Sequence, residues 1–445
     1  MSDPGNTSRR HFLGLAAAGS VGASIGIGAL AAGATQAAAQ STQQGRAHYK
    51  IFSPGRIGVM TLKNRIVRSA AFEGAGDADG FVTEDMIRIH RGYAEGGVGL
   101  TLTGYMSVME YGRKGSHVCA SNDRYIPGLA KLAKAVHDAA PGCKIGAEIG
   151  HDGSASPITT SGGPPGPPRL TNPSGNRWPN RIGPSGIDWR GESGAHAMTV
   201  AEIERFCVDM GHATRRLRDA GFDCVEIHGA HHYLINTFLS PFTNRRNDAY
   251  GGSLENRVRI VNDMMSEMRR HVGSTFPVII KLNCDDGASD NGTAGEIDIH
   301  NFPALVRAIA AAGVDAIDIS GGEKMGDPMR MNLGDVKDQS FYEPFANALD
   351  VNVPIILGCG NRNVEKLEAI LHKDRVDFFC IARPLIREPG LANRWLEGRG
   401  GPGVDCINSN LCFQHLMRTG TPMRCVVLEQ MQQAAWEMER MEQLG

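Results

Sequence analysis

The sequence contains no Asp, Glu, Lys or Arg between Arg10 and Arg46. This uncharged, Ala- and Gly-rich stretch follows Ser8-Arg9-Arg10-His11-Phe12-Leu13 and includes the small-residue site Ala37-x-Ala39. A paired arginine, a weakly apolar segment and such a site are typical of a twin-arginine export signal. A membrane anchor is the alternative, because the run is long enough to span, but its Gly and Ala content is unlike that of Leu-rich spans. We therefore expect residues 1–39 to be a cleaved leader, leaving a soluble periplasmic protein without a stable membrane span.

An excess of positive charge is also missing. Lys and Arg number 46 against 48 Asp and Glu, for a net charge of -2, and no basic run is long enough to follow a phosphate backbone. Nucleic acid is therefore excluded as an expected partner. The 445 residues are 41% hydrophobic, which is enough to bury one large core or two modest ones and excludes a disordered chain.

A third absence concerns the fold: no Gly-x-Gly-x-x-Gly motif follows the first apolar run, which argues against a doubly wound dinucleotide-binding sheet. Apolar runs alternate with helical periodicity over 126–139, 201–220 and 254–271. Eight such units predict an α/β fold, a (β/α)8 TIM barrel, over residues 48–400. The predicted strands are residues 64–70, 98–104, 144–150, 224–230, 277–283, 316–322, 354–360 and 378–384.

Two segments depart from this alternation. Residues 151–197 contain GGPPGPPRL, lack periodicity and are expected to form a long loop over the barrel mouth. Residues 401–445 form a cysteine-containing tail that ends in a polar, helix-like stretch.

Active sites of such barrels form at the carboxyl ends of the strands. The fourth predicted strand ends at His228, followed by His231 and Tyr233. Two imidazoles at this spacing direct N–H donors at one carbonyl or nitro oxygen, and a tyrosine supplies a proton. A zinc site, or histidines that only satisfy loop carbonyls, are the alternatives.

The seventh and eighth predicted strands end in a second pattern. Gly360 and Asn361 offer backbone N–H groups before a helix, and Arg383 lies at the eighth strand end. Such groups form a phosphate cradle. Tight turns beside a surface arginine are the alternative explanation.

The segment GFDCVEIHGAHHYLINTFLSPFTNRRNDAYGGSLENR (221–257) resembles the signature of the Old Yellow Enzyme family, the FMN-dependent ene-reductases and their relatives. NRIVRSA-x-FEG (64–74), VIIKLN (278–283), GCGNR (358–362) and ARPLIREP (382–389) resemble its other blocks. The resemblance covers about residues 48–400 and implies FMN at the barrel mouth.

The resemblance also implies individual roles. Lys281 matches the basic residue beside flavin N1 and O2, where a cation stabilises the anionic reduced ring. His228 and His231 match the pair that binds the substrate's activating oxygen, and Tyr233 matches the proton donor of members that reduce activated alkenes. The implied cofactor-binding set is Ala70, Ala71, Gly104, Glu148, Lys281, Gly360, Asn361, Ala382 and Arg383.

Two positions depart from the family pattern. Relatives often have Thr or Cys near flavin O4, where this chain has Ala71, and Gln near flavin O2 and N3-H, where it has Glu148. Alanine offers no hydrogen bond, and an ionised glutamate repels negative charge on the reduced ring. Both differences are expected to make the flavin harder to reduce.

The tail carries Cys406, Cys412 and Cys425, with Ser409 where the four-cysteine motif of iron–sulfur members of the family has a cysteine. Three thiolates hold a three-iron cluster, or a four-iron cluster with a weaker fourth ligand. In an oxidising compartment the competing interpretation is a disulfide between Cys406 and Cys412.

Three functions follow. The first is an FMN-dependent oxidoreductase that acts on an activated alkene or carbonyl-conjugated small molecule. Its electron donor or acceptor is left open, because NAD(P)H is not expected in the periplasm. The second is an exported amine dehydrogenase or demethylase with an aromatic cage, for which the sequence offers 4 Trp and 8 Tyr, with Trp178 and Trp189 in the long loop. The third is a degenerate ligand-binding barrel, since Ala71, Glu148 and Ser409 each lose a family feature.

The double variant Ala71→Thr, Glu148→Gln tests the two departures. It is expected to raise the midpoint potential of the bound flavin, because it restores a hydrogen bond and removes a negative charge. For a two-electron couple, each tenfold gain in relative affinity for the reduced ring corresponds to about 30 mV. A redox titration in which wild type matches or exceeds the double variant would contradict the expectation.

Overall fold

The computed structural model describes residues 45–109, 116–155, 181–188, 190–286, 297–322 and 335–444. The predicted leader and the two loop tryptophans, Trp178 and Trp189, lie outside the described residues. Gly45–Gly445 form one compact unit. In the part of the chain that is described, no helix combines the length and the apolar character needed to cross a membrane.

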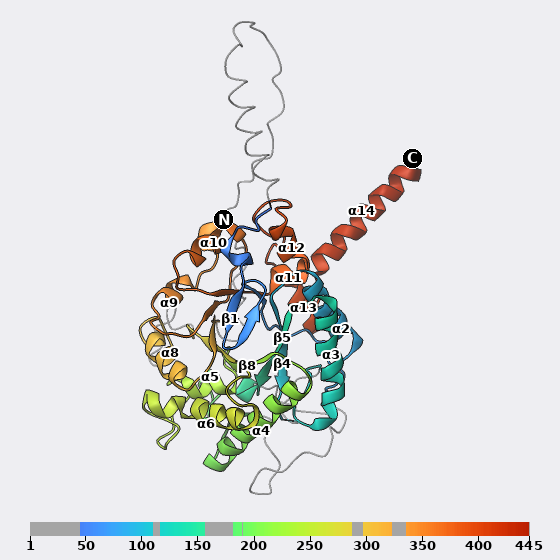
Figure 1. The fold of residues 1–445 in the computed structure, drawn as a ribbon. Helices are drawn as coiled ribbons and strands as arrows, with labels where there is room; N and C mark the ends of the chain where they lie inside the picture. Colours follow the sequence, from blue (N-terminus) through green and yellow to red (C-terminus); the bar gives the residue numbers. More distant parts are fainter. Residues whose placement is uncertain are drawn as a thin grey trace, which may run out of the picture. The chain divides into compact units, whose positions relative to one another are not determined.

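Eight parallel strands close into a barrel, so the predicted (β/α)8 TIM barrel is confirmed (Figure 1). Every residue of these strands is buried except Lys144, which explains why the sequence shows apolar runs without alternation. In barrel order the strands are β3 (Ile66–Arg68), β4 (Leu100–Ser107), β5 (Lys144–Gly150), β8 (Cys224–Gly229), β9 (Val278–Asn283), β10 (Ala316–Ser320), β11 (Ile355–Leu357) and β12 (Phe378–Ile381).

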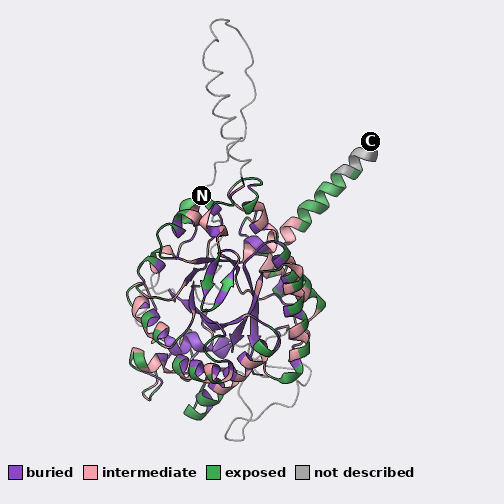
Figure 2. Cartoon of the chain, in the orientation of Figure 1, coloured by how far each residue is buried: buried purple, intermediate pink, exposed green. Residues whose placement is uncertain are grey.

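Helices surround the barrel, with buried faces inward and exposed faces outward (Figure 2). Side-chain caps define several starts: Thr199 and Glu202 form a capping box at α4, and Ser253 and Asn363 cap α6 and α10. The helices are α2 (Glu84–Glu95), α3 (Ile126–Ala139), α4 (Val200–Asp219), α5 (Leu234–Leu239), α6 (Leu254–Val272), α8 (Phe302–Ala311), α9 (Glu343–Asn347), α10 (Val364–Leu371), α11 (Arg383–Arg387), α12 (Leu391–Leu396), α13 (Leu411–Thr419) and α14 (Val426–Leu444), with short 3-10 helices at Lys50–Phe52, Asp123–Tyr125, Gly153–Ala155 and Val336–Asp338.

A hairpin that the sequence did not predict precedes the barrel. Its strands are β1 (Gly55–Ile57) and β2 (Met60–Leu62). Ile57, Met60 and Leu62 are buried in one cluster with interior residues of the barrel strands, such as Leu100 and Ile279. The hairpin therefore closes one end of the barrel and leaves the other end for ligands.

Several details of the predicted elements are wrong; the last strand, for example, ends at Ile381 and not at residue 384. β11 ends at Leu357, so Gly358–Gly360 form a loop. β4 continues past Gly104 to Ser107, with a register irregularity between Thr103 and Met106 that the pattern could not reveal. The segment expected to be only loop also contains two short paired strands, β6 (Ile182–Gly183) and β7 (His196–Ala197).

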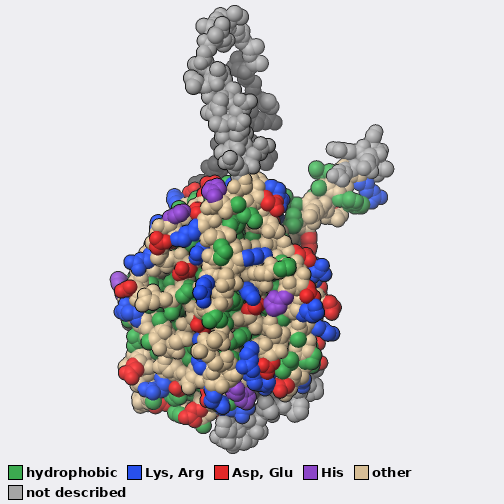
Figure 3. Space-filling view, in the orientation of Figure 1, with side chains coloured by type: hydrophobic (Ala, Val, Ile, Leu, Met, Phe, Trp, Pro, Cys, Tyr) green, Lys and Arg blue, Asp and Glu red, His purple; other side chains and the backbone are tan. Residues whose placement is uncertain are grey.

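The tail packs on the barrel at its start and becomes exposed toward its end. Leu416 is buried against Gly74, and the Met423 N–H donates to the Glu73 carbonyl oxygen at 2.7 Å. α14 is exposed along most of its length (Figure 2). On the face shown in Figure 3, acidic and basic side chains are interspersed rather than gathered by sign.

Glu73 ties the loop after β3 to β4. Its carboxylate lies 2.9 Å from Arg68 Nη1 and 3.1 Å from His90 Nε2, and it accepts the Gly104 N–H at 2.7 Å. Burial alone would raise the pKa of Glu73, but Arg68 and the hydrogen bonds lower it below its usual value. Glu73 thus fixes the backbone at Gly104, one of the predicted flavin-pocket residues.

We expect Glu73→Gln to lower the free energy of unfolding by about 3–5 kcal/mol, because it leaves the buried Arg68 charge uncompensated. Urea unfolding measures this. The depressed pKa means that the contribution is present above the pKa of the unfolded state and is lost as pH falls through that of the folded state. In the control, Glu95→Gln removes only an exposed pair with Arg91 and should cost less than about 1 kcal/mol. Equal losses in both variants would contradict the role assigned to Glu73.

Candidate active site

The barrel brings the predicted residues to the carboxyl ends of its strands. Ala70 and Ala71 follow β3, Gly104 and Glu148 lie on β4 and β5, and His228 and Lys281 lie on β8 and β9. The residues predicted for the phosphate follow β11 and β12: Gly360, Asn361, Ala382 and Arg383.

The two histidines and the tyrosine form an aromatic cluster. The ring centroid of His228 lies 5.1 Å from that of His231 and 4.5 Å from that of Tyr233, edge to face with the tyrosine. Tyr105 joins them, 5.6 Å from Tyr233. The sequence did not predict Tyr105, because it lies beyond the expected end of β4.

His231 is held in one orientation. Its backbone has a φ of 56°, which is uncommon outside glycine, and its N–H donates to Asn283 Oδ1 at 3.0 Å. One ring nitrogen lies 2.9 Å from Ser320 Oγ. Burial, and then the neighbouring His228 and Lys281, lower the pKa of His231 well below its usual value. His231 is therefore neutral at neutral pH and contributes one N–H.

Tyr233 keeps its proton. Burial, together with the carboxylates of Asp152 and Glu148, raises the pKa of Tyr233 well above its usual value. A tyrosine in this state donates a proton to a stronger developing base and not to water at neutral pH.

Lys281 lies among three buried carboxylates. Its Nζ is 2.6 Å from Glu148 Oε2, 2.7 Å from Glu226 Oε2 and 3.6 Å from Asp318 Oδ2. The four side chains are at most 5% exposed. The sequence did not predict Glu226 or Asp318, although Glu226 precedes His228 by two residues and so shares its face of β8.

Glu148 links this lysine to the histidine pair. Its Oε2 lies 3.3 Å from His228 Nδ1 as well as beside Lys281. Burial alone would raise the pKa of Glu148, but His228 and Lys281 lower it well below its usual value. Glu148 is therefore ionised, and its charge is offset by Lys281.

The turn after β11 has room only for glycine at its centre. Gly360 has a φ of 75°, and a Cβ there would lie 2.8 Å from the Phe341 ring and 2.9 Å from the Ser340 nitrogen. The Asn361 side chain donates to the Leu357 and Cys380 carbonyl oxygens at 2.7 and 2.9 Å. Asn361 thus braces β11 against β12 with its side chain, and only its backbone N–H is available for a phosphate.

Arg362 is a candidate that the sequence analysis missed. It is buried, and one nitrogen donates to the Cys406 carbonyl oxygen. Its Nε and Nη1 are buried and have no hydrogen-bond partner among the described residues. Its place in GCGNR, directly after the glycine turn, was the available signal. A buried cation with unmet donors beside such a turn suits an anionic group.

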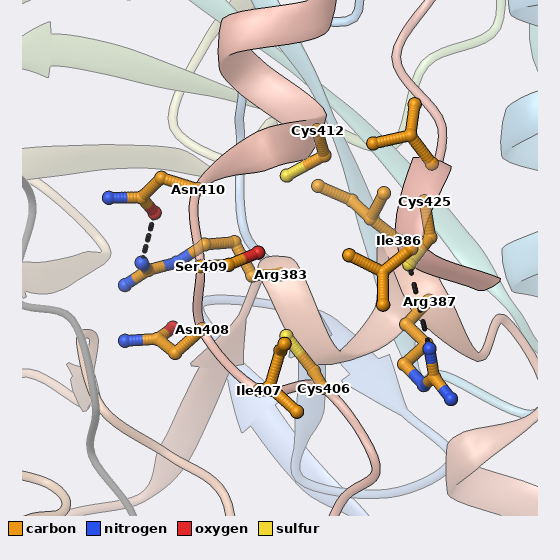
Figure 4. Close-up of a pocket in the computed structure, with 12 residues that line it drawn as sticks. Arg383, Ile386, Arg387, Cys406, Ile407, Asn408, Ser409, Asn410, Cys412 and Cys425 are labelled. Atoms are coloured by element: carbon orange, nitrogen blue, oxygen red, sulfur yellow. Dashed lines mark hydrogen bonds between the residues drawn. The ribbon is translucent and has the colours of Figure 1, made fainter. Parts of the chain in front are cut away.

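Arg383 connects the phosphate side to the tail. It donates to Asn410 Oδ1 and lines a pocket with Cys406, Cys412 and Cys425 (Figure 4). None of the ten cysteines, all within the described residues, forms a disulfide. The same residues contain no group of three or more His, Cys, Asp or Glu side chains placed for a single metal ion.

These residues fit FMN. The glycine turn and the unmet donors of Arg362 suit its phosphate. Gly104 leaves no space for a side chain, because a Cβ would lie 2.2 Å from Glu73 Oε2 and 2.6 Å from the Ala71 carbonyl oxygen. Lys281 places a buried ammonium group among these residues, and a cation near N1 is the group that stabilises a reduced flavin ring.

A sequence profile of the NADH:flavin oxidoreductase / NADH oxidase family matches residues 50–400. The chain is 30% identical to 4,4'-dithiodibutanoate disulfide reductase from Rhodococcus erythropolis, over 85% of this chain and 94% of the relative. It is 31% identical to a metal reductase from Desulforamulus reducens, over 85% of this chain and 53% of the relative. The chain thus spans about half the length of the metal reductase.

Solved structures share the fold. A 2-naphthoyl-CoA reductase complex is similar with a TM-score of 0.76 and 24% identity, over 85% of this chain and 56% of that one. An Old Yellow Enzyme homologue from Zymomonas mobilis is similar with a TM-score of 0.63 and 24% identity, over 80% of this chain and 94% of that one.

Alkylation tests the state of the tail cysteines. Brief treatment of the native protein with iodoacetamide should label Cys406 and Cys425, which are partly exposed, before Cys224 and Cys380. Burial raises the pKa of Cys224 and Cys380 well above the usual value, which suppresses the reactive thiolate. Peptide mass spectrometry reads the order. A Cys406–Cys412 linked peptide that is labelled only after reduction would contradict the free thiols.

Proposed function

Because the chain belongs to the NADH:flavin oxidoreductase / NADH oxidase family, we propose that this FMN oxidoreductase acts on an activated alkene or carbonyl-conjugated small molecule. The supporting observation is the fixed cluster of His228, His231 and Tyr233 beside Lys281. It places two imidazoles and a protonated phenol at the ligand end of the barrel. The disulfide reductase and metal reductase among the relatives show how widely substrates vary in this family.

Bound FMN supplies two-electron chemistry, accepting or giving a hydride. His231 and His228 bind and polarise the substrate's activating oxygen, with His231 oriented by Asn283 and Ser320. Tyr233 holds the proton that an alkene carbon accepts. Lys281 stabilises negative charge at the reduced ring, and Glu148 limits that effect by pairing with it. Gly360, Asn361, Ala382 and Arg383 are the proposed phosphate site, and we add Arg362 because of its unmet donors.

Export by the twin-arginine pathway is part of the proposal. It rests on the paired arginines and the uncharged segment 11–45. All of these residues except Gly45 lie outside the described residues. A periplasmic enzyme draws electrons from a quinol or redox protein, or passes substrate electrons onward. Fast bleaching of the flavin by NADH or NADPH in stopped flow would count against a non-nicotinamide partner.

An iron–sulfur cluster is the second proposed cofactor. Cys406, Cys412 and Cys425 surround one pocket, without a disulfide between them (Figure 4). Ser409 lines the same pocket and offers an oxygen in place of the fourth thiolate. The test is an iron and sulfide analysis of protein purified without oxygen. Iron and sulfide that are present in wild type and lost in Cys412→Ser support the cluster. If wild type contains neither, the cysteines are free thiols or a disulfide pair.

Amine oxidation is the alternative function, favoured by one observation. Tyr105 and Tyr233 lie edge to face, and the Asp152 carboxylate acts on the pKa of both. Aromatic faces with a nearby carboxylate suit an ammonium group. If the protein oxidises amines, anaerobic mixing with a tertiary amine bleaches the oxidised flavin. If it reduces activated alkenes, an enone reoxidises the reduced flavin.

Tyr233→Phe tests the first function. The flavin reduced by dithionite should be reoxidised by 2-cyclohexenone about 10²–10⁴-fold more slowly than in wild type, because the proton donor is gone. Tyr125→Phe is the control, because Tyr125 is not part of the cluster and its hydroxyl donates to the Asp79 carbonyl oxygen. This variant should react like wild type. An unchanged rate in Tyr233→Phe would refute the assigned role. A colourless protein that takes up no FMN would instead favour a degenerate binding barrel.

A further inference from the structure

The carboxylates around Lys281 outnumber its charge. Glu148 on β5, Glu226 on β8 and Asp318 on β10 all face this one ammonium group, within 3.6 Å of Nζ. All four side chains are buried, so water does not screen them. Three ionised carboxylates with a single cation would leave a net charge of two buried negative units, which a protein interior does not tolerate.

One proton reduces this excess to a single negative unit, and the geometry indicates where that proton resides. Glu226 Oε1 and Asp318 Oδ1 are buried and have no hydrogen-bond partner among the described residues, whereas Glu148 also lies beside His228. A buried carboxylate oxygen without a partner favours the protonated form. Burial raises the pKa of both, although Lys281 opposes the shift. The pKa of Glu148 is lowered instead, so it remains the ionised partner of Lys281. The Glu226–Asp318 carboxyl pair thus holds one proton and has capacity for a second.

The neighbours of the cluster connect it to the ligand end. Glu148 lies between Lys281 and His228, whose ring belongs to the predicted substrate site. On the opposite side, the Cys380 thiol of β12 donates to Asp318 Oδ2 at 3.3 Å. Among the described residues, a chain of titratable groups therefore runs from His228 through Glu148 and Lys281 to the carboxyl pair.

We propose that the Glu226–Asp318 carboxyl pair takes up one proton from solvent when flavin bound at this site is reduced by two electrons. Reduction adds negative charge near Lys281, and in a buried cluster that charge favours protonation of a neighbouring carboxyl group. Because Lys281 and His228 hold Glu148 in its ionised form, the remaining ionised carboxyl group of the Glu226–Asp318 pair is the site that takes the proton. Of the two protons that accompany two electrons, one bonds to the ring and one forms an O–H bond on Glu226 or Asp318. Because Lys281 is already paired with Glu148, it neutralises the negative charge of the reduced ring only in part. The proton taken up by the carboxyl pair offsets the rest of that charge.

The inference rests on the proposed flavin site, and a holoenzyme titration separates the two. Dithionite serves as the electron donor, and the midpoint potential is measured from about pH 6 to pH 9. If purified protein neither carries nor binds FMN, the proposed function fails before the titration begins. If it binds FMN, wild type should take up two protons for each two electrons. The double variant Glu226→Gln, Asp318→Asn should take up one.

Asp223→Asn is the matched control. It removes a partly buried, ion-paired carboxylate at the other end of β8, bonded to Lys144 and His137, and should still take up two protons. An uptake of one proton per two electrons in wild type overturns the inference. An uptake of two in the double variant also overturns it, and would place the second proton on the ring.

Infrared difference spectroscopy gives a second readout that needs no variant. On reduction, wild-type holoenzyme should gain a protonated-carboxyl band that shifts in D2O. A reduced-minus-oxidised spectrum without such a band also overturns the inference, even if the double variant does not fold.

Discussion

The contact between Lys281 and its buried carboxylates is the constraint on which the candidate active site depends. A single ammonium group holds Glu148, Glu226 and Asp318 from three different strands. Removing such a cation from a buried cluster is costly, because each carboxylate has already given up its hydration. The same four side chains therefore hold neighbouring strands of the barrel together and set the charge that a bound flavin would meet. Redox behaviour and fold stability are not independent here.

The tail extends this dependence to the phosphate side. Arg362 donates to the Cys406 carbonyl oxygen and Arg383 to the Asn410 side chain, so both arginines of the proposed phosphate site contact the tail. Burial, together with the nearby Arg362 charge, lowers the pKa of Arg383. Two clustered cations are stabilised by an anion between them. The residues that would hold FMN and the cysteines that would hold a cluster are thus parts of one connected surface.

The barrel could be predicted from the sequence because each strand is buried on both faces and reads as an apolar run. The helix predicted over 126–139 coincides with α3. Contacts between strands were harder to predict. That Glu226 and Asp318 both approach Lys281 depends on the register of β8, β9 and β10, which the sequence of no single strand determines. Tyr105 was missed because β4 is irregular after Gly104, and the docking of the tail because Leu416 and Gly74 meet across more than three hundred residues.

Lys281 is the proposed source of the positive charge that a bound flavin meets. The most direct test is the midpoint potential of FMN in Lys281→Met, compared with Lys144→Met, which removes a lysine paired with Asp223 away from the ligand end. We expect a potential below that of wild type in Lys281→Met only, because the reduced ring then faces carboxylates without their cation. A potential equal to or above that of wild type in Lys281→Met would contradict it.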